Sequence, residues 1–98
     1  MSNKVKVRML KLARDRIDCG RSRYICIALM EEALNSEERQ AAYNLRTDIM
    51  VLLEGYGSLD FWLRAKGFSV TLKDKEKLKQ TRLNWIDHLI KEYSNDHK

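Results

Sequence analysis

Hydrophobic residues recur along this chain at the spacing of a helix, most clearly near its C-terminus. In residues 78–93, one helical face carries Trp85, Leu89 and Tyr93. Arg82 falls inside the same apolar stripe, three residues before Trp85. An arginine in that position either extends its charged end out of the core or meets a partner.

Glycines divide the rest of the chain, which contains no proline. They occur at Gly20, at Gly55 and Gly57, and at Gly67, and glycine is favoured just past the end of a helix. Ser22, Ser36 and Ser58 are the predicted N-caps of the helices that follow. The predicted helices run from near Val5 to Cys19, from Arg23 to Leu34, from Glu37 to Glu54, from Leu59 to Ala65 and from Asp74 to Tyr93.

Two segments have patterns that also fit an extended structure. Val5 and Val7 alternate with lysines, so a short strand is an alternative there, although no partner strand is evident. Residues 68–72 also alternate, and we interpret them as an extended connector. Residues 24–30 are apolar nearly all round, which is typical of a buried helix and predicts the central element of the core.

These patterns predict an all-α fold, a compact bundle of four to five helices whose last helix is long and amphipathic. The 98 residues are enough for a single domain, residues 1–98, and residues 94–98 are expected to be a frayed polar tail.

Charge is unevenly distributed along the chain, whose net charge is +5. Residues 1–23 hold eight Lys/Arg and two Asp, whereas residues 24–60 hold two Arg and seven Asp/Glu. Residues 61–98 are basic again, with nine Lys/Arg and five Asp/Glu. A basic–acidic–basic chain either neutralises itself when its segments pack or presents separate charged faces.

The longest uncharged apolar run has seven residues, far short of the roughly 20 that cross a membrane. We therefore expect a soluble protein without an export signal. Cys19 and Cys26 belong to no metal-binding motif, and a reduced, cytoplasmic protein is favoured, although a turn at Gly20 leaves a disulfide open.

Chemistry-bearing motifs are absent from the sequence. No phosphate-binding glycine loop, nucleophile elbow or zinc pattern occurs. His88 lacks a neighbouring nucleophile or a second metal ligand, and we interpret it as a surface residue. The sequence therefore predicts a protein that is not an enzyme and that has no cofactor, catalytic residue or metal site.

Arginines beside apolar stripes are the candidate partner-binding residues. Phe61 and Trp62 are adjacent on a short helix, so both cannot face the interior, and Phe61 is expected to be exposed next to Arg64. For Arg82 an internal ion pair is the favoured interpretation, with Asp48 and Glu54 as the first candidate partners. The predicted protein-binding residues are Arg23, Phe61, Arg64 and Arg82.

The basic N-terminal part offers an alternative function, the binding of nucleic acid. Lys4, Arg8 and Lys11 form one helical row, and Arg21 and Arg23 flank the start of the next helix. No helix suits a major groove, because the helix after Gly20 is too apolar.

Several short motifs resemble a group of small uncharacterised proteins encoded by tailed bacteriophages. They are Arg23-Tyr24-Ile25-Cys26, Leu59 with Trp62-Leu63, and Thr81-Arg82 with Trp85-Ile86-Asp87 and Leu89-Ile90. The resemblance spans roughly residues 23–93 and implies an accessory phage protein that acts in the cytoplasm of the infected bacterium. It supplies no catalytic residues.

Small phage proteins often bind and inhibit a host enzyme or defence complex. The resulting hypothesis is a non-enzymatic helical protein that binds and modulates a bacterial host protein. The alternatives are a small basic nucleic-acid-binding protein and a homo-oligomeric subunit of a larger particle; a membrane is not expected as a partner.

Overall fold

A computed structural model of the protein describes residues 3–67 and 75–95. Within them the chain forms helices only, which confirms the predicted all-α bundle. In order they are α1 (Asn3–Asp18), α2 (Ile25–Glu32), α3 (Ser36–Leu52), α4 (Leu59–Ala65) and the long α5 (Lys75–Asn95). The connector predicted for residues 68–72 lies outside the described residues.

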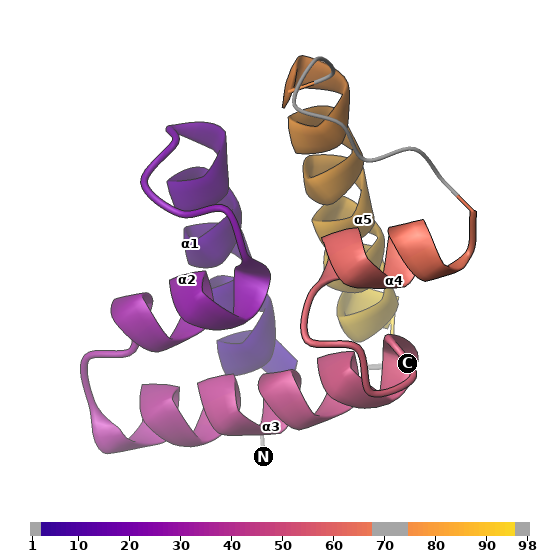
Figure 1. Cartoon of the computed structure of the whole chain (residues 1–98). Helices are drawn as coiled ribbons and strands as arrows, with labels where there is room; N and C mark the ends of the chain where they lie inside the picture. Colours follow the sequence, from indigo (N-terminus) through magenta and orange to yellow (C-terminus); the bar gives the residue numbers. More distant parts are fainter. Residues whose placement is uncertain (1–2, 68–74, 96–98) are drawn as a thin grey trace.

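The central helix is α1, not α2 as the sequence suggested. It packs against α2, α3 and α5, and Figure 1 shows it behind α2 and beside α5, with α2, α3 and α4 on the near side. Its buried stripe is Val5, Met9, Leu10, Ala13 and Ile17. The alternative strand at its start is wrong, since Val5 and Val7 both lie inside this helix.

The first part of α2 is apolar nearly all round but is not buried all round. Ala28 and Leu29 are fully buried, whereas 53% of Ile27 is exposed. An eight-residue helix at the edge of a bundle has neighbours on one side only, so surplus apolar residues stay outside the core.

Two of the predicted N-caps, Ser22 and Ser36, do not cap the helices that follow them. The amides of Arg21 and Ser22 donate to the carbonyl of Arg16, so these residues close α1 and do not cap α2. Asn35, not Ser36, caps α3 by accepting a 2.8 Å hydrogen bond from the Glu38 amide.

The other predicted boundaries agree closely with the structure. Ser58 caps α4 by accepting from the Phe61 amide, as predicted. Gly55 and Gly67 follow α3 and α4 with φ of +85° and +92°, a conformation that glycine adopts without steric cost. The last helix continues through Ser94 and Asn95, two residues of the expected tail.

One apolar core joins the five helices, and α4 contributes Leu59 to it. The third helix contributes Ala41, Ala42, Leu45 and Ile49, followed by Leu53, whereas Leu52 is 52% exposed. On α5 the buried face is centred on Leu83, Ile86 and Leu89, while Trp85 and Tyr93 are only partly buried.

Replacing Leu45 with alanine should lower the free energy of unfolding by about 2–5 kcal/mol, because the fully buried side chain leaves a cavity. Val51→Ala, on the same helix but 74% exposed, should change it by less than about 0.5 kcal/mol. Urea unfolding followed by circular dichroism measures both variants. Equal losses would contradict the assignment of the two faces of α3.

Candidate protein-binding surfaces

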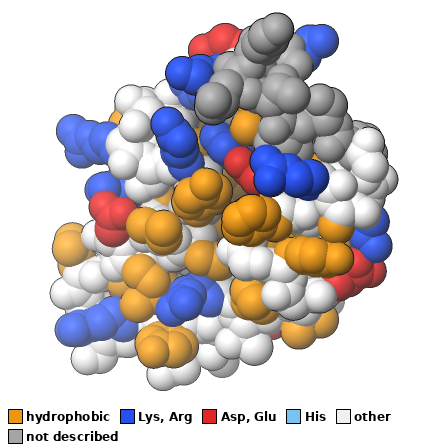
Figure 2. Space-filling view, in the orientation of Figure 1, with side chains coloured by type: hydrophobic (Ala, Val, Ile, Leu, Met, Phe, Trp, Pro, Cys, Tyr) orange, Lys and Arg blue, Asp and Glu red, His pale blue; other side chains and the backbone are white. Residues whose placement is uncertain are grey.

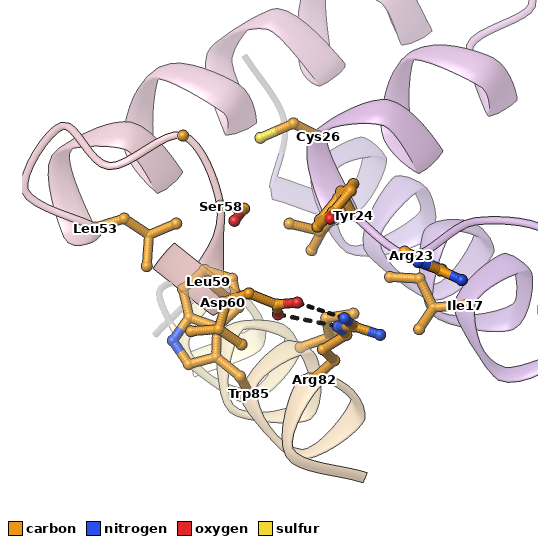
Figure 3. Close-up of a pocket in the computed structure, with 13 residues that line it drawn as sticks. Ile17, Arg23, Tyr24, Cys26, Leu53, Ser58, Leu59, Asp60, Arg82 and Trp85 are labelled. Atoms are coloured by element: carbon orange, nitrogen blue, oxygen red, sulfur yellow. Dashed lines mark hydrogen bonds and ion pairs between the residues drawn. The ribbon is translucent and has the colours of Figure 1, made fainter. Parts of the chain in front are cut away.

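Arg82 lies in a half-enclosed ion pair between α5 and α4. Its guanidinium donates to both carboxylate oxygens of Asp60, at 3.1 and 2.5 Å, and Figure 3 shows the two side chains facing each other. The side chains of Arg82 and Asp60 are 14% and 13% exposed. The guanidinium also lies 5.9 Å from the centroid of the Tyr24 ring. Arg82 therefore fastens α4 and the start of α2 to the last helix.

The prediction of an internal ion pair for Arg82 is confirmed, but both predicted partners are wrong. Asp48 instead accepts a hydrogen bond from Tyr93 and lies 3.7 Å from Lys6. Glu54 pairs with Lys66 at 2.6 Å, and this hydrogen bond lowers the pKa of the Glu54 carboxyl. Asp60 lies in the first turn of α4, which Ser58 caps, and from there its carboxylate reaches Arg82 of α5.

Three of the four predicted partner-binding residues line one groove of about 420 Å³. Arg23 and Arg64 are exposed, and the paired Arg82 lines the same groove. Arg23 points away from the Arg82–Asp60 pair in Figure 3. Phe61 does not line the groove, but it is 55% exposed and is separated from Arg64 by one helical turn.

The predicted nucleic-acid-binding residues are divided between the two ends of α1. Lys4, Arg8 and Lys11 line a shallow hollow together with Ser94. Arg21 and Arg23 follow the other end of that helix. The charge of Arg8 is also partly neutralised, since its Nη2 donates to Glu38 at 3.1 Å.

Ion pairs bring the basic first segment and the acidic middle together, as the charge pattern allowed. Arg16 holds both Glu31 and Glu32, and a hydrogen bond with Glu32 raises the pKa of the arginine above its ordinary value. Glu38 is buried between Arg8 and the amide of Leu34. Much of the acidic middle is thus neutralised within the molecule.

A second surface, formed by α2 and α3, was not predicted from the sequence. Its members, which we call the α2–α3 surface, line two hollows that meet at Arg46. They are Cys26, Ile27 and Met30 of α2, and Tyr43, Arg46, Thr47, Met50 and Val51 of α3. Tyr43 is 58% exposed, and Arg46 lies 5.7 Å from the centroid of its ring.

The sequence did contain a signal for this surface. The α3 stripe that ends at Leu53 needs only one side of the helix, yet Tyr43, Met50 and Val51 are apolar on the other side. Apolar residues on both sides of a helix outnumber the positions that one core contact can bury. Assigning residues to the core by type alone concealed this excess.

The cysteines lie in different surroundings and are both free thiols. Cys19 is exposed at the end of α1, whereas Cys26 is partly buried beside Arg46. Burial raises the pKa of the Cys26 thiol, and the charge of Arg46 opposes that increase.

Within residues 3–67 and 75–95, no group of three His, Cys, Asp or Glu side chains is placed to hold a metal ion. No helix in that part of the chain is long and apolar enough to cross a membrane. No protein-family model matches the chain, and no curated protein or solved structure is significantly similar to it.

Removing one member of the α4–α5 ion pair should destabilise the fold. Asp60→Ala leaves the Arg82 guanidinium mostly enclosed without its carboxylate, and we expect a loss of about 1–3 kcal/mol in the free energy of unfolding. The double variant Asp60→Ala with Arg82→Leu should recover part of that loss, because no unpaired charge remains.

Urea denaturation of the two single variants and the double variant measures the coupling. Additive effects of the two substitutions would show that the pair does not hold α4 in place.

Proposed function

We propose that this protein acts by binding another protein through the side of the molecule formed by α2, α3 and α4. The observation that supports this proposal most directly is the distribution of exposed hydrophobic side chains. Among the described residues, every large hydrophobic that is exposed lies between Tyr24 and Phe61. Figure 2 shows hydrophobic side chains gathered over the face on which these three helices lie in front.

The exposed residues of the other two helices, α1 and α5, provide a comparison within the same molecule. The fully exposed residues of α1 and of the described α5 are all polar or charged. Scattered apolar residues are normal on a monomer, but a concentration on one side is typical of an interaction site. The composition supports this proposal, since Tyr, Met and Arg are enriched in protein interfaces.

The resemblance to small proteins of tailed bacteriophages supplies the class of partner. On that basis we propose a non-enzymatic accessory protein that binds a bacterial host protein, in the host cytoplasm, and modulates or inhibits it. Of the four residues predicted from the sequence, Phe61 belongs to the exposed apolar set, while Arg23 and Arg64 are exposed cations at its border. Arg82 has a structural role in this proposal.

Affinity capture from bacterial lysate, with and without the variants Val51→Ser and Phe61→Ser, tests the proposal. Each substitution removes an exposed apolar side chain, so we expect a specific host protein to be retained at least about tenfold less. Lys91→Ser, on the polar side of α5, is the matched control and should retain it fully. Equal retention by all variants would rule out this face as the binding site.

Nucleic-acid binding is a second candidate because Lys4, Arg8 and Lys11 gather around one hollow. If these side chains contact phosphates, binding to duplex DNA should weaken steeply between ~50 and ~200 mM salt. The double variant Lys4→Ala with Lys11→Ala should reduce the slope of the logarithm of the binding constant against the logarithm of the salt concentration by the contribution of about two phosphate contacts. Fluorescence anisotropy measures the binding constants. No binding at ~50 mM salt would eliminate this function.

A further inference from the structure

The α2–α3 surface has the form of an open trough with a cation near its middle. One hollow, of about 300 Å³, lies between Ile27 and Met30 of α2 and Arg46 of α3. The other, of about 620 Å³, continues along α3 past Met50 and Val51. Arg46 borders both hollows, so whatever occupies the trough passes over its guanidinium.

The length of the trough matches a short helix. Along α3 its lining runs from Tyr43 to Val51 and recurs every three or four residues, and it continues past the end of the helix to Glu54. The helical part extends about 13 Å, roughly two and a half turns. Helices that bind in grooves place apolar side chains at the same spacing, so a partner helix of three or more turns has a matching row of contacts here.

The charge of the trough indicates which kind of partner segment fits it. Arg46 has no carboxylate within ion-pair distance among residues 3–67 and 75–95. The two acids that border the trough already have partners, Glu31 with Arg16 and Glu54 with Lys66. Within the described part of the chain, the trough is therefore mostly apolar, holds one arginine without an ion-pair partner, and has no unpaired carboxylate beside it.

We propose that this trough binds an acidic amphipathic helix of the partner protein, whose apolar side chains cover Ile27, Tyr43 and Val51 and whose carboxylate pairs with Arg46. The proposal rests on the proposed function and specifies the chemistry of the partner. A planar guanidinium takes a carboxylate through two parallel hydrogen bonds, which gives both orientation and affinity.

A second copy of this chain is a poorer occupant. In a symmetric pair the same surface meets itself, so each Arg46 would face a trough whose own carboxylates are already paired. The net charge of +5 on each copy adds repulsion, whereas the same charge attracts an acidic segment.

A library of random 20-residue peptides displayed on yeast and sorted against the full chain tests the proposal. We expect the enriched peptides to carry apolar residues at i, i+3, i+4 and i+7, together with Asp or Glu. Fluorescence anisotropy then gives the affinity of a selected synthetic peptide for wild type and for variants.

Arg46→Glu should weaken binding by about 100-fold and Arg46→Gln by about tenfold, because the first reverses the charge and the second only removes it. Val51→Ser should weaken binding as well, through the apolar contact. The matched control, Lys91→Glu, makes the same charge change on α5 and should alter the affinity by less than about twofold, since a distant exposed charge acts only weakly.

Enrichment of basic or uncharged peptides, an absence of enriched binders, or equal binding by Arg46→Glu and wild type would each overturn the proposal. So would a dimer of the wild-type chain, seen by sedimentation equilibrium, that Val51→Ser abolishes. If a host protein is captured by Arg46→Glu as well as by wild type but is lost with Val51→Ser, the proposed function stands and the acidic helix does not.

Discussion

Burial of the first helix is the constraint on which the rest of the structure depends. Its stripe from Val5 to Ile17 is covered on three sides by α2, α3 and α5, and each of these contributes one face to the same core. The fourth helix adds Leu59 to this core and is also joined to α5 by the ion pair between Asp60 and Arg82. Because three helices suffice to cover one, the outer sides of α2 and α3 take no part in the core.

Arginine has two different roles in this molecule, and the difference lies in the carboxylates within reach. Arg14, Arg16 and Arg82 join segments far apart in the chain, to Asp87, to Glu31 and Glu32, and to Asp60. Among residues 3–67 and 75–95, Arg46 has no such acid, although it lies in the most acidic third of the sequence. Ion pairs within the fold therefore account for the first group, whereas the contacts of Arg46 are with the Tyr43 ring and the Cys26 thiol.

Sequence patterns predicted the helices well because core stripes and glycine ends are local signals. The same patterns predicted less about which residues contact one another in the folded protein. Asp48 and Glu54 were the expected partners of Arg82, but which acid faces an arginine depends on how α4 crosses α5, and spacing contains no such information. The error for α2 has a similar cause: its residues are apolar enough for full burial, but only tertiary packing decides that Ile27 remains exposed.

The contrast between α3 and α5 is the basis of the proposed binding face. Both helices bury a stripe against the same core, and their outer sides take no part in that core. The outer side of α5 is polar, as solubility favours, whereas that of α3 carries Tyr43, Met50 and Val51. Because these three side chains are exposed and take no part in the core, they belong to the face for which we propose a protein partner, as concentrated exposed apolar residues are typical of interaction sites.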